Sequence, residues 1–285
     1  MNKNIIYLNN KYIPLNKAKI SVLDRGFLFA DGIYEVIPIY NGKPFRSQQH
    51  LERLERSLKN ISLPSPLNQT QWFNIFNKLI KKNKASIGCY HFYIQITRGA
   101  AQSRGHAFPE NIPPTILVTL NKSTKNLPLE ILMQGKSAII CDDIRWKNCH
   151  IKSIALLPNI LFSEQAHKAD SEEAILIRDG YAIEGASSNL FIVKNNTLIT
   201  PPLSPYILGG ITRDAILELA KLNNIQYQEQ PISEAELKNA NEIWISSSTR
   251  EIYPITKLNN NPVANGKVGP IWQRMIKLYR DACNS

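Results

Sequence analysis

The spacing of apolar residues changes repeatedly along this chain, and that change limits the possible folds more than any other feature. Apolar runs flank four turn dipeptides, and this arrangement predicts β-hairpins around Asn9-Asn10, Asn41-Gly42, Asp179-Gly180 and Asn195-Asn196. Apolar residues three and four positions apart predict helices over 47–60, 70–83, 209–222 and 271–283. We expect Ser47 to cap the first helix. Because both halves mix hairpins with helices, the fold class expected is α+β.

The length of the chain and one polar stretch indicate two domains. A chain of 285 residues suffices for one large domain or two ordinary ones. The stretch NKSTKNLP, residues 121–128, is rich in linker-type residues and separates the two halves. We therefore expect a small N-terminal domain over 1–120, a linker over 121–135 and a C-terminal domain over 136–285.

The formal net charge of +11 leaves several classes of protein open. It arises from 34 Lys and Arg against 23 Asp and Glu. Such an excess is compatible with a protein that binds nucleic acid or a membrane surface, and with an enzyme for anionic substrates. The basic residues are dispersed, and only Lys81-Lys82 forms an adjacent pair. Because no nucleic-acid-binding motif accompanies them, we expect no nucleic-acid partner.

The cysteines and the apolar runs suggest a cytoplasmic location. Cys89, Cys141, Cys149 and Cys283 have neither C-x-x-C spacing nor the density of a disulfide framework, so we expect no zinc site. The apolar stretch near the N-terminus is too short for a signal peptide. Pro and Gly interrupt the longest uncharged runs, so we expect no membrane span.

Two turns in the second half have the composition of an anion site. The first, Gly209-Gly210-Ile211-Thr212, precedes a predicted helix whose first N–H groups can bind a phosphate. The second, Ser246–Thr249, follows a predicted strand and offers hydroxyls and N–H groups. Both patterns are also typical of ordinary structure, the first of a loop ending in an N-cap and the second of a turn.

Lys152 and Glu184 are candidates for the chemistry. A lysine among apolar residues, as in HIKSIALL, can act as an amine nucleophile, although such lysines more often extend to the surface. Glu184 ends a predicted strand, where a carboxylate can hold a protonated ring nitrogen or bond to a turn. A phosphate seat, an amine and a carboxylate together match the needs of pyridoxal 5′-phosphate.

The order of several motifs resembles the class IV, or fold-type IV, pyridoxal-phosphate aminotransferases. The resemblance runs nearly end to end, through the segments SVLDRGFLFADGIYEV, HLERL, TRGAAQSRGHAFPE, DDIRWKNCHIKS, YAIEGASSNLF, GGITRDAI and SSSTREIYPI. It is strongest to the D-amino-acid (D-alanine) aminotransferases. It implies a small N-terminal α/β domain, a larger C-terminal α/β-barrel-like domain and a cofactor cleft.

The resemblance assigns a role to each candidate cofactor residue. Lys152 corresponds to the lysine that forms a Schiff base and moves the proton. Glu184 corresponds to the acid at the pyridine nitrogen, and Arg53 of HLERL, in preference to Arg56, to the phosphate-binding arginine. The remaining phosphate contacts implied are the N–H groups of Ile211 and Thr212, the Thr212 hydroxyl, Ser248 and Thr249. Leu208 is expected to pack on the ring, with Ser187 nearby.

The substrate-binding residues implied are Tyr34, Arg104 and His106. Strand alternation places Tyr34, Val36 and Pro38 on one face of their strand and Glu35, Ile37 and Ile39 on the other. The resemblance places Tyr34, Arg104 and His106 around the substrate α-carboxylate, with the Arg104 and His106 loop reaching across a homodimer interface. Pro38 suggests an edge strand or a bulge.

The resemblance implies ping-pong transfer of an amino group from a D-amino acid to a 2-oxo acid such as 2-oxoglutarate. The alternatives on the same fold are an L-branched-chain aminotransferase and a 4-amino-4-deoxychorismate lyase. Branched-chain enzymes usually have Phe-Glu-Gly-Ile-Arg where this chain has Tyr34-Glu35-Val36-Ile37-Pro38. Arg250 replaces a small residue typical of the family, and either contacts a second substrate carboxylate or faces away.

Overall fold

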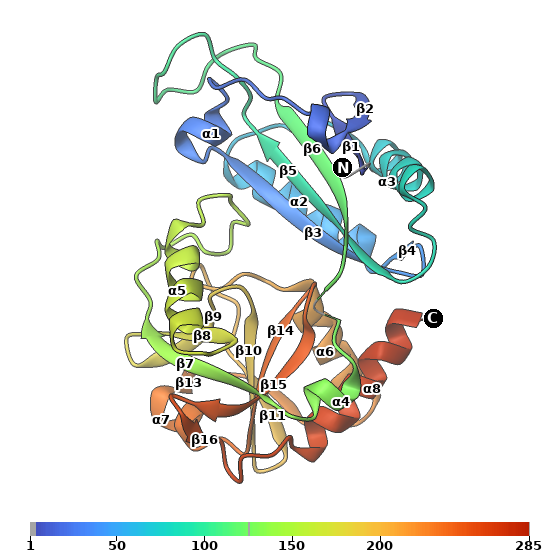
Figure 1. The fold of residues 1–285 in the computed structure, drawn as a ribbon. Helices are drawn as coiled ribbons and strands as arrows, with labels where there is room; N and C mark the ends of the chain where they lie inside the picture. The colour runs from blue at the N-terminus through green and yellow to red at the C-terminus, as the bar shows by residue number, and fades with distance from the viewer. Residues whose placement is uncertain (1–3, 125, 285) are drawn as a thin grey trace. The chain divides into compact units, whose positions relative to one another are not determined.

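The computed structural model describes residues 4–124 and 126–284, which form two compact units (Figure 1). Unit 1 comprises Met1–Ser123 and Ile151–Ala155, and unit 2 comprises Thr124–His150 and Leu156–Ser285. Each unit contains its own β-sheet with helices packed on it. The α+β prediction is therefore confirmed.

Unit 1 contains a six-stranded antiparallel sheet with helices α2 and α3 packed on one face. The strands follow the order β2-β1-β6-β5-β3-β4. Their bounds are β1 Ile5–Leu8, β2 Lys11–Pro14, β3 Gly32–Tyr40, β4 Lys43–Pro44, β5 Cys89–Thr97 and β6 Thr115–Lys122. The helices are the 3-10 turn η1 Leu15–Lys17, α1 Arg25–Phe29, α2 Ser47–Asn60 and α3 Gln69–Asn83.

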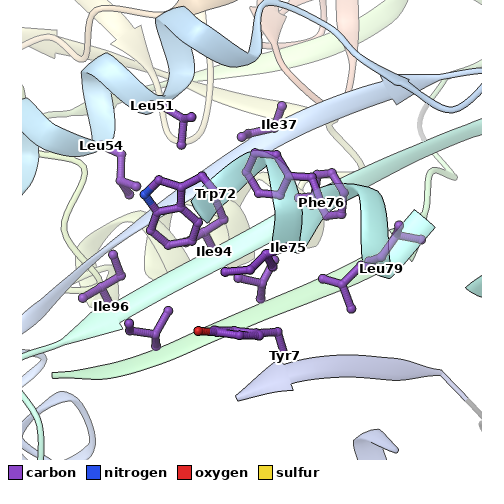
Figure 2. Packing of buried hydrophobic residues seen from close by; sticks show 14 of the residues in the cluster. Tyr7, Ile37, Leu51, Leu54, Trp72, Ile75, Phe76, Leu79, Ile94 and Ile96 are labelled. Carbon is purple, nitrogen blue, oxygen red and sulfur yellow. The ribbon is translucent and has the colours of Figure 1, made fainter. Parts of the chain in front are cut away.

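The core of unit 1 lies between the sheet and helices α2 and α3 (Figure 2). Ile37 and Ile94 extend from the sheet toward Leu54 of α2 and Phe76 of α3, and all four are buried. Because strand residues alternate between faces, Tyr34 and Val36 lie on the opposite face of β3 and stay half-buried. That second face is therefore available for a site.

The start of α2 differs from the sequence prediction. The helix begins at Ser47, and the N-cap position is Arg46, which adopts a left-handed backbone with φ of +51°. The prediction that Ser47 caps α2 is wrong, because this left-handed residue turns the chain directly from β4 into the helix and Ser47 already has helical geometry. At α3, by contrast, Asn68 and Gln71 form a reciprocal capping box.

Unit 2 contains a ten-stranded mixed sheet in the order β12-β11-β10-β14-β15-β7-β8-β9-β13, with β16 paired to β15. The neighbours β15, β7 and β8 are parallel, as are β11 and β12. The strand bounds are β7 Lys136–Asp142, β8 Glu173–Arg178, β9 Tyr181–Gly185, β10 Asn189–Lys194, β11 Thr197–Thr200, β12 Tyr227–Glu229, β13 Ile232–Ser233, β14 Glu242–Ser247, β15 Glu251–Leu258 and β16 Asn261–Pro262. Strands β9 and β10 also contact each other, so the sheet is curled.

Five helices accompany this sheet: α4 Leu129–Leu132, α5 Leu157–Lys168, α6 Ile211–Leu222, α7 Glu234–Lys238 and α8 Pro270–Asn284. Helix α5 packs on β7 and β8, and α6 packs on β14 and α8. The stretch expected to be a linker begins with the end of β6 and includes α4. Among the helices of the described residues, none combines the length and apolar character needed to cross a membrane.

All four predicted hairpins are confirmed, each with a two-residue loop. The residues that close the loops are Leu8 with Lys11, Tyr40 with Lys43, Arg178 with Tyr181, and Lys194 with Thr197. Both loop residues have positive φ in every case, for example +48° at Asn41 and +79° at Gly42. Asn, Asp and Gly tolerate this conformation best, which explains why these dipeptides locate the turns.

Candidate active site

The backbone of Lys152 pairs with the edge of β3, and its side chain lies beside Tyr34. The backbone N–H of Tyr34 donates to the Lys152 carbonyl at 2.9 Å, and the N–H of Ile154 donates to the Gly32 carbonyl at 3.1 Å. This pairing explains why Ile151–Ala155 belongs to unit 1. The Lys152 ammonium lies 4.2 Å from the centroid of the Tyr34 ring, a favourable cation–π distance. The structure thus brings the predicted amine and the predicted phenol together.

The pairing of β3 also clarifies Pro38. Strand β3 pairs with β5 along its whole length without a bulge, whereas β4 pairs only with Ile39 and Tyr40. Pro38 therefore lies where β4 makes no ladder pair with β3, which agrees with the edge position and not with the bulge.

Arg53 projects from α2 into a buried charge cluster beneath the other face of β3. It donates from Nε and Nη2 to the two carboxylate oxygens of Glu35, at 2.9 and 2.6 Å. The His50 ring nitrogen lies 3.1 Å from Glu35 Oε1. Burial alone would raise the pKa of Glu35, but the charge of Arg53 and the hydrogen bonds from Arg53 and His50 outweigh it and hold that pKa far below its usual value. Arg56, one helical turn away, is exposed.

Arg104 and His106 lie on an exposed loop that α1 fastens to unit 1. The buried Arg25 donates to the carbonyls of Gly105 at 2.6 Å and His106 at 3.1 Å. The Arg104 guanidinium lies 4.8 Å from the Phe29 ring centroid, and the His106 ring lies 5.4 Å from it. Both predicted carboxylate-binding side chains therefore gather around Phe29.

Glu184 ends β9 in unit 2 with its carboxylate buried. Arg145 donates to Oε1 at 2.6 Å, and the backbone N–H of Leu208 donates to Oε2 at 3.0 Å. Burial raises the pKa of Glu184 to about 7, and the neighbouring Arg145 opposes that rise. Arg145 also donates twice to Asp143, at 2.9 and 3.0 Å, which fixes its guanidinium. Glu184 is thus an oriented acceptor.

Asn189 joins the two turns predicted to bind phosphate. It pairs with Ser246 across β10 and β14, and its Nδ2 donates to the Leu208 carbonyl at 2.8 Å and to Glu184 Oε2 at 3.3 Å. A Cβ at Gly210 would collide with the Asn189 amide oxygen, so only glycine allows this approach. The start of α6 and the end of β14 therefore both lie next to Asn189.

The hydrogen-bonding groups around Asn189 fit a cofactor with a phosphate and a protonated ring nitrogen, because donors suit the phosphate and the Glu184 acceptor suits the ring N–H. Within the described residues, no side chain caps the first turn of α6, where Ile211 and Thr212 lie. The Ser246 hydroxyl is buried and has no hydrogen-bond partner among residues 4–124 and 126–284. Uncapped N–H groups and a spare hydroxyl suit an anion, and the buried Glu184 carboxylate suits a cationic N–H. The groups that pyridoxal 5′-phosphate requires of unit 2 are all present.

The remaining predicted residues also lie in unit 2. Ser248 and Thr249 form the half-buried tip between β14 and β15. Ser187 lies in the connection from β9 to β10, where it contacts Glu173 and Arg250. The residues that sequence reasoning missed are Glu35, His50, Arg145 and Asn189. Each stands within a motif that carried the resemblance, but its partner could not be identified from spacing alone.

A family profile and a relative of known name both match nearly the whole region that holds these residues. The profile of "Amino-transferase class IV" matches residues 32–258. A D-alanine aminotransferase of Staphylococcus aureus (strain COL) is 40% identical over 270 residues, which cover 95% of this chain and 94% of the relative.

Two solved structures share the fold. The branched-chain amino acid aminotransferase of Escherichia coli superposes with a TM-score of 0.88 at 26% identity, over 96% of this chain and 93% of that one. The T.th. branched-chain amino acid aminotransferase with pyridoxamine 5′-phosphate has a TM-score of 0.90 at 23% identity, over 99% and 94%. The second likeness concerns the fold only. Together with the matched profile, these findings show that the chain belongs to the amino-transferase class IV family and is an aminotransferase dependent on pyridoxal 5′-phosphate.

Proposed function

We propose that this chain transfers the amino group of a D-amino acid of the D-alanine type to a 2-oxo acid such as 2-oxoglutarate. The observation that carries the proposal is the Lys152 amine 4.2 Å from the Tyr34 ring, on the face of β3 that the core leaves open. The name of the Staphylococcus aureus relative supports the choice of donor.

The proposal gives each residue one task. When bound, pyridoxal 5′-phosphate supplies the electron sink for the bond that breaks at the substrate Cα. The Lys152 amine takes the proton from the substrate Cα and would deliver it to C4′ of the cofactor, while Tyr34, Arg104 and His106 bind the α-carboxylate. Glu184 accepts a hydrogen bond from the ring nitrogen. Arg53, the first turn of α6, Ser248 and Thr249 bind the phosphate, Leu208 packs on the ring, and Ser187 lies beside it.

A panel of amino donors tests the proposal against its alternatives. The panel contains D-alanine, L-leucine, L-valine and 4-amino-4-deoxychorismate, with 2-oxoglutarate as acceptor. We expect D-alanine to be the preferred donor, because Val36-Ile37-Pro38 departs from the branched-chain pattern. Transfer from L-leucine or L-valine without transfer from D-alanine would favour the branched-chain alternative, and pyruvate release from aminodeoxychorismate would favour the lyase.

Replacing Arg104 by alanine is expected to raise the KM for D-alanine about 10- to 100-fold with a smaller change in kcat, because charged hydrogen bonds contribute about 1.5–3 kcal/mol. Arg104 is exposed and has no acidic partner among residues 4–124 and 126–284, so its loss leaves no buried charge unpaired. Steady-state kinetics measure the effect. Arg56→Ala, which removes an exposed arginine of α2, is the matched control. An unchanged KM would remove Arg104 from the site.

We also propose that the protein is a cytoplasmic homodimer in which the Arg104 loop completes the neighbouring subunit's site. Mixing Lys152→Ala and Arg104→Ala protomers tests this directly. If the loop acts across the interface, half of the dimers are mixed and contain one intact site of two, so about one quarter of wild-type activity returns at low D-alanine. If the loop serves its own subunit, no site is intact and activity does not return.

A further inference from the structure

Arg250 carries a buried charge that the proposed function does not use. Its side chain is almost fully enclosed. Arg250 donates from Nε to Glu172 at 3.1 Å and from Nη1 to Glu173 at 3.0 Å. The same Nη1 donates to the Ser187 hydroxyl at 2.8 Å. The guanidinium thus contacts two carboxylates and one hydroxyl, all within unit 2.

These contacts connect two turns that lie far apart in the sequence. Arg250 closes the tip between β14 and β15, where its N–H donates to the Ser247 hydroxyl at 3.3 Å. The next residue, Glu251, has a left-handed backbone with φ of +62° and begins β15. From this tip the guanidinium reaches Ser187, in the connection between β9 and β10. Both turns carry hydroxyls that the proposed function assigns to the cofactor site.

Glu173 orients the hydroxyls of Ser187 and Ser188, in the connection between β9 and β10. Its buried carboxylate accepts from Ser188 at 2.8 Å and from Ser187 at 3.3 Å. Because Ser187 donates its proton to Glu173 and accepts from Arg250, its hydroxyl can accept one further hydrogen bond, from a donor group of a ligand. A Cβ at Gly185 would collide with Ser188 and press on Glu173, so the arrangement is tightly packed.

The charge of this cluster disfavours a role in binding an acidic substrate. One guanidinium faces the carboxylates of Glu172 and Glu173, so the group as a whole is formally negative. A second substrate carboxylate would have to compete with both glutamates for the guanidinium, and displacing Glu173 would leave that carboxylate buried without a counter-charge, which is costly. The contacts therefore indicate that Arg250 holds neighbouring residues of unit 2 in place and does not bind the substrate.

We propose that Arg250 is a positioning residue that fixes Ser187 and the Ser246–Thr249 turn toward the cofactor and does not bind the substrate side chain. The inference rests on the proposed function, because that function assigns both turns to the cofactor. It adds a residue that acts on the site through Ser187 and Glu173.

Cofactor affinity provides a test that does not depend on turnover. Pyridoxal 5′-phosphate is titrated into cofactor-free wild type, Arg250→Met, Arg250→Lys and Ser187→Ala, with binding followed by absorbance. We expect the Kd to rise about tenfold in Arg250→Met, and less in Arg250→Lys, because an ammonium cannot reproduce the fork of contacts. The unfolding midpoint of each cofactor-free variant is measured alongside. A lower midpoint with an unchanged Kd would indicate a merely structural role and overturn the inference.

A double replacement tests whether Arg250 acts through Ser187. If it does, Arg250→Met with Ser187→Ala binds the cofactor about as weakly as the weaker single variant, because coupled residues are not additive. If the two residues act independently, the fold-changes in Kd of the single variants multiply in the double variant. That result would contradict an action of Arg250 through Ser187. If Arg250→Met does not fold, the same cycle with Arg250→Lys decides the question.

The donor preference separates positioning from substrate binding. We expect the ratio of kcat/KM for D-aspartate over D-alanine to stay within about threefold of wild type in the folded Arg250 variants, because no substrate contact is lost. A selective loss of kcat/KM for D-aspartate would show that Arg250 binds the second carboxylate of that substrate. Wild-type protein that binds no pyridoxal 5′-phosphate would refute the proposed function itself, whereas equal Kd values in all variants would refute only the role of Arg250.

Discussion

Replacing Lys152 by alanine is expected to lower the rate of transamination about 10³- to 10⁴-fold or more, because the proposed function assigns the movement of the substrate proton to this amine. The fold should survive this change. The contacts that fix the segment are made by its backbone, from Tyr34 N–H to the Lys152 carbonyl and from Lys152 N–H to the Ser57 hydroxyl at 3.3 Å. Loss of activity would then report on chemistry and not on unfolding.

Two measurements check the Lys152 prediction. The first is the rate of transfer from D-alanine to 2-oxoglutarate. The second is the intact mass after borohydride treatment of protein loaded with pyridoxal 5′-phosphate, where wild type should retain the cofactor covalently and Lys152→Ala should not. Lys147→Ala, which removes an exposed lysine from the same stretch of chain, is the matched control. Turnover of Lys152→Ala within about tenfold of wild type would contradict the assignment.

Replacing Glu35 by glutamine is expected to lower the free energy of unfolding by about 3–5 kcal/mol at pH 7, because it leaves the buried Arg53 guanidinium without its counter-charge. Glu35 is fully buried and Arg53 nearly so, and their two hydrogen bonds are short. Urea unfolding measures the loss. Glu55→Gln, on the solvent-exposed side of α2, is the control and should change little.

The same pair predicts how stability depends on pH. Because the pKa of Glu35 is lowered in the folded protein, the unfolded chain binds a proton first when the pH falls below the ordinary value of 4.5. The wild type should therefore lose stability from about pH 4.5 downward. The difference in free energy of unfolding between wild type and Glu35→Gln should then become smaller as the pH falls. Burial lowers the pKa of His50, so the comparison is repeated in a His50→Asn background to remove that titration. A difference in free energy of unfolding that grows on acidification would contradict a stabilising charge on Glu35.

The local turns and the four helices α2, α3, α6 and α8 could be predicted because neighbouring residues determine them. A hairpin such as Asn41-Gly42 needs two residues that tolerate positive φ, and both are visible in the sequence. Helix α5 was not predicted, because its apolar residues do not form one buried stripe. Phe162 is buried, whereas Leu157 and Ile160 are exposed.

The candidate site could be predicted only as a set of separate motifs. Glu184 and the glycines before α6 are recognisable because their residue types and surroundings are unusual. The contacts of Arg145 with Glu184 and of Arg250 with Glu173 join residues far apart in the chain, and no spacing rule connects them. These pairings depend on which strands the sheet brings together, a property of the whole unit.

The two faces of β3 have a consequence for how the donor range of such an enzyme can change. Tyr34 and Val36 face outward, and Glu35 and Ile37 face the core. If Tyr34 binds the substrate as proposed, substitutions at the outward positions alter which donors the enzyme accepts and leave the buried Glu35–Arg53 ion pair intact, so this strand can be varied at every second residue. A one-residue insertion or deletion would exchange the faces and bury the phenol in place of the carboxylate. Donor range should therefore diversify by replacement within β3, and not by changes in its length.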